Sequence, residues 1–94
     1  MEHAYFIVYD ADTIKSNADT IEKVAHMVSV YWYQITDCVW LIRSSLSPNE
    51  IFDKMKKRLI SGDRLLIIEA KNNKQGLLPQ SDWDFLNKDI FNER

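Results

Sequence analysis

The first strand-like run of the chain, residues 4–9, carries apolar side chains on both of its faces. It reads Ala-Tyr-Phe-Ile-Val-Tyr, and successive side chains of an extended strand point to opposite sides of a sheet. Both sides must therefore be shielded from water, as in a central strand that is covered on both faces. The run ends on Asp10, and a bare carboxylate is costly to bury, so we expect the strand to end where Asp10 reaches water, a metal ion or a partner.

The segments that follow predict a helix and then two short strands. Residues 18–28 place apolar side chains at helical spacing, and Ser16 or Asn17 can cap the start of this helix. Residues 31–36 and 38–43 are rich in aromatic and β-branched side chains, which favour strands. Only one aspartate separates these two runs, so we expect a tight hairpin.

The sharpest local signal is the sequence at residues 47–50, which predicts the start of a second helix. Ser47 fits the N-cap, Pro48 fits the first helical position, and Glu50 completes a capping box. We expect Gly62 to end this helix in the left-handed conformation, before a last strand over residues 65–69. The side chains expected to form the buried stripe of this helix are Ile51, Phe52, Met55 and Leu59.

The predicted order is β-α-β-β-α-β over residues 1–70, which defines a ferredoxin-like core of the α+β class. Right-handed crossovers place both helices on one face of a four-stranded antiparallel sheet and leave the other face open. Since the strands are apolar on both sides, we expect a second copy of the chain to cover the open face in a homodimer.

Residues 71–94 form a C-terminal extension of different character. It begins with a polar loop, and Ser81 can cap a short helix that contains Trp83, Phe85 and Leu86. Apolar side chains at this density are expected to dock on the sheet or on the neighbouring subunit.

Charge and composition narrow the class of protein. A formal net charge of −2 gives no overall attraction to nucleic acid, although a local basic patch remains compatible with it. Cys38 is the only cysteine, which fits a reducing compartment. The first residues lack a signal-peptide core, and no apolar run approaches the roughly 20 residues of a membrane span. We therefore expect a cytoplasmic protein that does not contact a membrane.

Asp10 and Asp12 are the candidate metal ligands. Two carboxylates at a strand end can hold Mg²⁺ through one or two oxygens, while water completes the octahedron, and a metal-bound water can hydrolyse a phosphodiester. A two-fold dimer that apposes both copies of Asp10 would double the ligands. The alternative is that Asp10 only ends the strand and Asp12 only starts a turn.

The basic residues of the second helix are the candidate nucleic-acid contacts. Lys54, Lys57 and Arg58 lie close together in the sequence, and Arg64 follows just beyond the helix. Such a surface can bind phosphates. The alternative is a solvated helix face on which Glu50 pairs with Lys54.

Several short motifs occur in a fixed order along nearly the whole chain. They are residues 5–10 (YFIVYD), 34–36 (QIT), 39–40 (VW), 61–68 (SGDRLLII) and 78–87 (LPQSDWDFLN). In this order they resemble the CRISPR-associated Cas2 family, and above all its stand-alone, SinR-like members. More distantly, the arrangement is similar to the toxin VapD.

The resemblance implies a ferredoxin-like homodimer whose sheets meet at the interface, with a C-terminal segment that often crosses to the partner. Some Cas2 proteins are described as Mg²⁺-dependent nucleases that use the aspartate at the position of Asp10. Cas2 also holds DNA during spacer integration without cleaving it, and VapD is an endoribonuclease. Cas2 proteins usually carry arginines soon after the first strand, whereas residues 11–15 here read ADTIK.

Two functional hypotheses follow. The first is a homodimeric binding or scaffold module that holds a protein or a nucleic acid in a defence, counter-defence or toxin–antitoxin setting. The alternative is a Mg²⁺-dependent endonuclease, acting on RNA or DNA, that uses Asp10 at the dimer interface. A transcriptional regulator is disfavoured because the sequence has no helix-turn-helix pattern. Both predicted helices are also expected to pack in the core, which leaves neither free to bind DNA.

Overall fold

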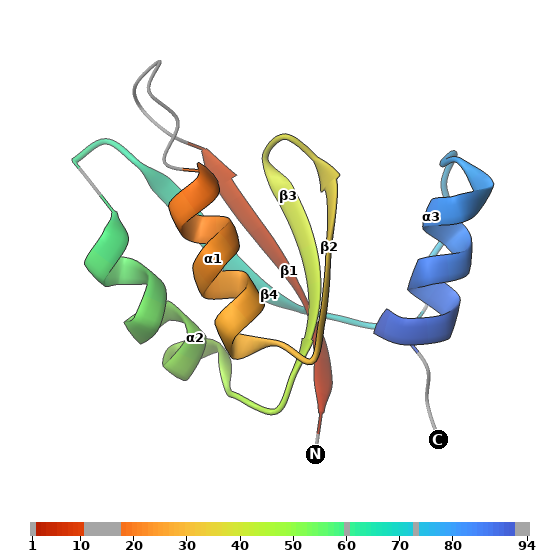
Figure 1. Cartoon of the computed structure of the whole chain (residues 1–94), viewed down its shortest axis with the longest axis horizontal. Helices are drawn as coiled ribbons and strands as arrows, with labels where there is room; N and C mark the ends of the chain where they lie inside the picture. Colours follow the sequence, from red (N-terminus) through yellow and green to blue (C-terminus); the bar gives the residue numbers. More distant parts are fainter. Residues whose placement is uncertain (1, 11–17, 60, 73, 92–94) are drawn as a thin grey trace.

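A four-stranded antiparallel sheet with helices on both sides is seen in the computed structural model, which describes residues 2–10, 18–59, 61–72 and 74–91 (Figure 1). The strands are β1 (His3–Asp10), β2 (Tyr31–Thr36), β3 (Val39–Ser44) and β4 (Arg64–Ala70). The helices are α1 (Ala18–Val28), α2 (Pro48–Met55), the 3₁₀ turn η1 (Lys56–Arg58), α3 (Gln80–Phe85) and the π-helical turn η2 (Leu86–Ile90).

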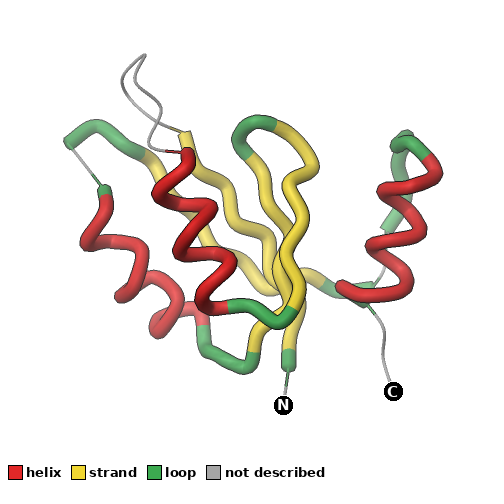
Figure 2. The backbone as a smooth tube through the Cα atoms, in the orientation of Figure 1, coloured by secondary structure: helices red, strands yellow, loops and turns green. Residues whose placement is uncertain are grey.

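The strand order is β2-β3-β1-β4, and every neighbouring pair is antiparallel. This order confirms the predicted α+β class and is compatible with a ferredoxin-like fold. β1 lies between β3 and β4, so that Phe6 is opposite Leu41 on one side and Ile68 on the other. β4 forms one edge of the sheet, and Figure 2 shows it in yellow beside β1.

The two apolar faces of β1 meet different parts of the chain, as the alternation predicts. Tyr5, Ile7 and Tyr9 are buried in the larger core, between the sheet and the α1–α2 layer. The other buried members of that core are Ile21, Val24, Ala25, Val28, Trp40, Ile42, Ile51 and Met55. This layer is therefore complete within one chain.

The opposite face of the sheet is covered in part by the C-terminal segment, which we define as α3, η2 and Phe91. Leu86, Ile90 and Phe91 are buried against Ala4 of β1 and Leu41 of β3. Figure 1 shows α3 on the side of the sheet away from α1 and α2. The extension was expected to dock on the sheet or on a neighbouring subunit, and in the structure it docks on the sheet of its own chain.

Some local predictions differ from the structure. Gly62 has a positive φ of 91°, but α2 and η1 have already ended at Arg58, so the glycine serves the turn before β4. Ser81 lies inside α3, whose N-cap is Pro79, and it makes no side-chain cap. Phe52 is exposed although its spacing placed it in the buried stripe. The proposed caps of α1, Ser16 and Asn17, lie outside the described residues.

The capping box of α2 is present as predicted. The Glu50 backbone N–H donates to Ser47 Oγ at 3.2 Å, and the Ser47 backbone N–H donates to Glu50 Oε1 at 3.0 Å. Two backbone donors that the helix itself cannot satisfy are thereby paired.

We predict that Ser47→Ala lowers the free energy of unfolding by about 1 kcal/mol, because it removes the acceptor for the Glu50 N–H. Urea denaturation followed by circular dichroism measures this change. The matched control is Ser45→Ala, since Ser45 is exposed and lies outside the cap. Equal effects of the two substitutions would contradict the prediction.

Candidate functional site

The predicted metal ligand Asp10 is exposed at the end of β1, where its register partner on β4 is Arg64. An arginine is therefore the residue that pairs with Asp10 across the two strands. Asp12 lies outside the described residues.

A second carboxylate, Asp63, belongs to the same end of the sheet. The buried Tyr9 donates a hydrogen bond from its hydroxyl to Asp63 Oδ2 at 2.9 Å. Asp63 directly precedes β4, and β4 begins where the antiparallel β1 ends. Sequence reasoning missed this residue, although its position just before the strand that pairs with β1 was a usable signal.

Among the described residues, no three His, Cys, Asp or Glu side chains are grouped closely enough to hold a metal ion. Mg²⁺ can be held by one or two carboxylates with water as the remaining ligands, so Asp10 stays a predicted ligand. A second copy of the chain that apposes its own Asp10 would add a further carboxylate.

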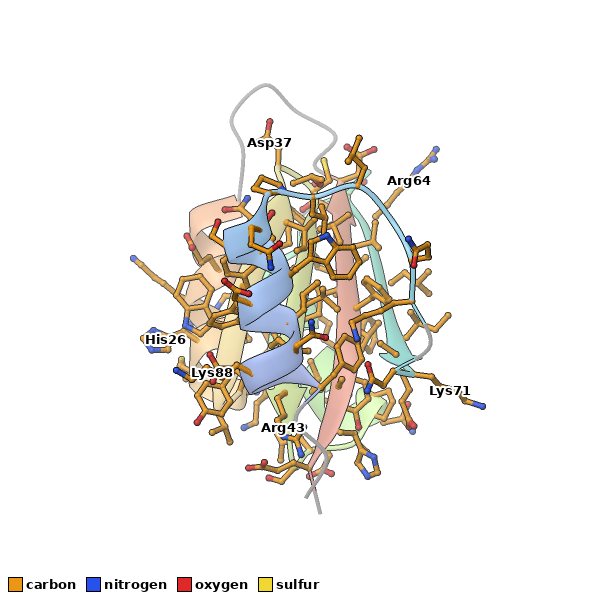
Figure 3. The ribbon with its side chains drawn as sticks, turned by 90° about the vertical axis from the view of Figure 1, so that its right-hand side faces the viewer. His26, Asp37, Arg43, Arg64, Lys71 and Lys88 are labelled. Atoms are coloured by element: carbon orange, nitrogen blue, oxygen red, sulfur yellow. The ribbon has the colours of Figure 1, made fainter. Side chains whose placement is uncertain are left out.

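The four predicted phosphate contacts are exposed, but they do not share one surface. Lys54, Lys57 and Arg58 lie on α2 and η1, in the helical layer. Arg64 is in register with Asp10, whereas its neighbour Leu65 packs against the helical core, so strand alternation directs Arg64 to the opposite face. Figure 3 shows the Arg64 side chain pointing outward from the edge of the sheet.

An apolar strip occupies the part of the second face that the C-terminal segment leaves free. We call it the β1–β4 strip and define it by Phe6, Val8, Leu66 and Ile68, which face one another in register. Phe6 is 36% exposed, Leu66 56% and Ile68 51%. The sequence predicted that one apolar face of the sheet is uncovered. In the structure, the uncovered apolar part of that face is the β1–β4 strip, at the β4 edge of the sheet.

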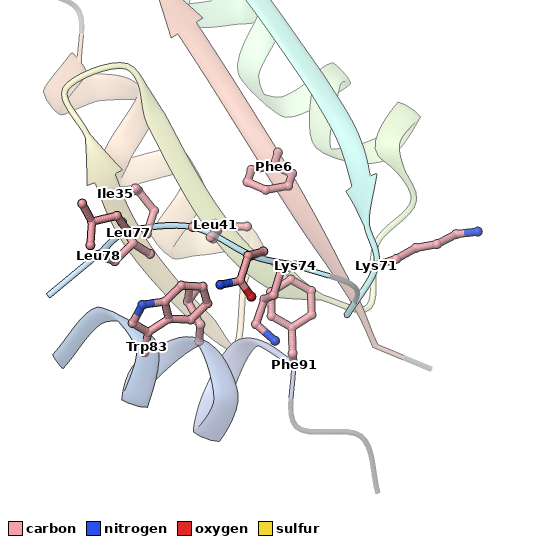
Figure 4. Close-up of a pocket in the computed structure, with 12 residues that line it drawn as sticks. Phe6, Ile35, Leu41, Lys71, Lys74, Leu77, Leu78, Trp83 and Phe91 are labelled. Carbon is pink, nitrogen blue, oxygen red and sulfur yellow. The ribbon is translucent and has the colours of Figure 1, made fainter. Parts of the chain in front are cut away.

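A groove of about 260 Å³ separates the strip from the C-terminal segment (Figure 4). Phe6, Ile35 and Leu41 line it from the sheet, and Trp83 and Phe91 line it from the C-terminal segment. Lys71 and residues 74–78 complete its wall, and Lys74 Nζ lies 4.6 Å from the centroid of the Phe91 ring.

Hydrogen bonds and a stacked ring pair hold the C-terminal segment against the sheet. The Tyr33 hydroxyl donates to Asp82, and the Tyr33 ring stacks on Phe85 with centroids 4.7 Å apart. Arg43 donates from Nη1 to the Ile90 carbonyl at 2.9 Å and pairs through Nε with a Glu2 carboxylate oxygen at 2.9 Å. In Figure 3, Arg43 lies beneath the end of this segment. The hydrogen bond to the Asp82 carboxylate is the main cause that raises the pKa of Tyr33 above its ordinary value.

The fold and the strip define a small α+β protein with an incompletely covered sheet. The chain matches no protein-family model and no curated protein. Within the described ranges, no helix has both the length and the apolar character that crossing a membrane requires.

We predict that Tyr33→Phe lowers the free energy of unfolding at neutral pH, because it keeps the stacked ring and removes the donor to Asp82. A raised pKa in the folded state means that this stabilisation is present below the ordinary pKa of 10.0 and is lost as the pH rises through the raised value. Urea denaturation of both proteins over this pH range should therefore show a difference that shrinks with rising pH.

Tyr31→Phe is the control, since Tyr31 is exposed on the same strand. It should leave both the stability and its pH dependence close to those of the wild type. A difference between wild type and Tyr33→Phe that stays constant above pH 10 would contradict the role assigned to Asp82.

Proposed function

We propose that the chain acts as a small homodimeric binding or scaffold module of the Cas2-like kind. The observation that carries this proposal is the exposed β1–β4 strip. Fully burying a large apolar side chain is worth about 1.5–3 kcal/mol, so a monomer forgoes a sizeable stabilisation at Phe6, Leu66 and Ile68. The run at residues 65–68 is also entirely apolar on an edge strand, without the lysine or proline that usually discourages pairing.

The same features favour a protein as the further partner of the dimer. The net charge of −2 opposes general attraction to nucleic acid, and the exposed strip is apolar. Duplex nucleic acid docked on Lys54, Lys57 and Arg58 is the competing possibility. Within this proposal, the setting is defence, counter-defence or toxin–antitoxin function in the cytoplasm, as the resemblance implies.

We predict that the double variant Leu66→Ser and Ile68→Ser sediments as a monomer, while the wild type sediments as a dimer. The physical reason is the loss of apolar area from the strip in both copies at once. Met27→Ser is the matched control, because Met27 is 75% exposed but lies on α1, away from the strip. A wild-type chain that stays monomeric at every concentration tested would exclude the dimer.

A Mg²⁺-dependent endonuclease is the second candidate, favoured by the two carboxylates, Asp10 and Asp63, at one end of the sheet. A bound Mg²⁺ would supply a nucleophilic water and neutralise charge on the phosphate. Asp10 would hold the ion, and Asp63 is already engaged by Tyr9.

We predict, for this second candidate, that Asp10→Asn abolishes Mg²⁺-dependent cleavage of single- and double-stranded RNA or DNA. Asp37→Asn, in the exposed turn between β2 and β3, should retain it. Cleavage that survives in Asp10→Asn would identify a contaminating enzyme.

A further inference from the structure

The groove between the β1–β4 strip and the C-terminal segment is apolar along its walls and carries charge of one sign. Three of the side chains that line it are aromatic: Phe6, Trp83 and Phe91. Among the described residues, its only charged lining side chains are Lys71 and Lys74, and no aspartate or glutamate lines it. Small-molecule sites have this chemistry, because apolar walls hold the ligand body while a few polar groups fix its orientation.

The volume of the groove limits the size of the ligand. At about 260 Å³ it is slightly smaller than the roughly 300–1,000 Å³ of pockets that take drug-sized ligands. A dry cavity of about 150 Å³ holds one benzene ring, so this groove has room for two fused rings. Its aromatic walls can stack on such rings or meet them edge to face. The ligand body that fits is therefore a small aromatic ring system.

Lys74 supplies the charge at the groove. Its ammonium group lies over the Phe91 ring and donates a hydrogen bond to the side-chain oxygen of Asn72. The face of an aromatic ring attracts a cation, so Phe91 and Asn72 hold the ammonium beside the groove. Lys71 also lines the groove, but Figure 4 shows its side chain extending away from it. Since no carboxylate among the described residues lines the groove, its charge complements an anion.

We propose that the groove binds a small aromatic carboxylate. Its rings would pack against Phe6, Trp83 and Phe91, and its carboxylate would accept hydrogen bonds from Lys74 Nζ. An ammonium group has three N–H donors, of which Asn72 takes one, so two remain for the ligand. One chain supplies all of these contacts, so the site does not depend on the proposed dimer.

The chain offers one substitution for each half of the site and a matched control. Lys74→Met removes the charge and keeps an unbranched apolar side chain. Lys88→Met makes the same exchange on η2, where Lys88 is exposed and does not line the groove. Gly76→Val narrows the groove, since a Cβ at position 76 would lie 4.0 Å from Trp83 Cζ2 in an ordinary contact. Gly76 has no positive φ, so its backbone accepts a side chain without strain.

The first experiment is an NMR titration of the ¹⁵N-labelled full chain with β-naphthoate. The indole N–H resonances report separately, because Trp83 lines the groove, whereas Trp40 is buried in the larger core and Trp32 packs against that core. We expect the Trp83 resonance to shift saturably, with a dissociation constant of about 1 mM or below, and the Trp40 resonance to stay in place. A Trp83 resonance that does not move at about ten times that concentration would overturn the proposal.

The second experiment separates the charge from the apolar walls. We expect Lys74→Met and Gly76→Val each to weaken binding of β-naphthoate about five-fold or more, and Lys88→Met to leave it unchanged. The neutral isostere β-naphthamide should bind the wild type more weakly than β-naphthoate, and equally weakly in Lys74→Met. Unchanged resonances of the larger core confirm that each variant is folded. Equal affinity of the wild type for the acid and the amide, equal losses in Lys74→Met and Lys88→Met, or tighter binding of octanoate would each overturn the proposed ligand chemistry.

Discussion

The need to cover both faces of β1 governs the rest of the structure. Tyr5, Ile7 and Tyr9 require one apolar layer, while Ala4, Phe6 and Val8 require another on the opposite side. The two crossover connections of the βαββαβ order supply only the first layer, because right-handed connections place α1 and α2 on the same face. The second layer must come from outside that order, and the C-terminal segment provides part of it.

This second layer is placed by a few specific contacts at the β2–β3 side of the sheet. Tyr33 binds Asp82 and stacks on Phe85, and Arg43 holds the Ile90 carbonyl. The segment thereby covers the β2–β3 side, while Phe6, Leu66 and Ile68 of the β1–β4 strip stay exposed. The incomplete cover is thus a consequence of where these anchors lie, and it concentrates the exposed apolar surface at one edge of the sheet.

The sequence was sufficient to predict the class of fold because the signals involved are local. Strand alternation assigned the faces of β1, and the spacing of Ser47 and Glu50 located the start of α2. Gly62 and Ser81 were assigned the wrong roles because helix ends also depend on packing: α2 and η1 end four residues before Gly62, and α3 begins at Gln80. The contact of Asp63 with Tyr9 joins residues 54 positions apart, so no local pattern points to it and only the pairing of β4 with β1 does.

The register also links the strip to the charged end of the sheet. Asp10 follows Phe6 and Val8 on the same face of β1, and Arg64 precedes Leu66 and Ile68 on the same face of β4. A dimer formed through the strip would bring two such pairs toward one another. Each pair holds one acidic and one basic residue, so two pairs add no net charge to such an interface. Association through the strip needs only apolar side chains that are already exposed there, whereas a shared metal ion would need the two Asp10 carboxylates to converge, so association is easier to achieve with these residues than metal chemistry at the end of the strip.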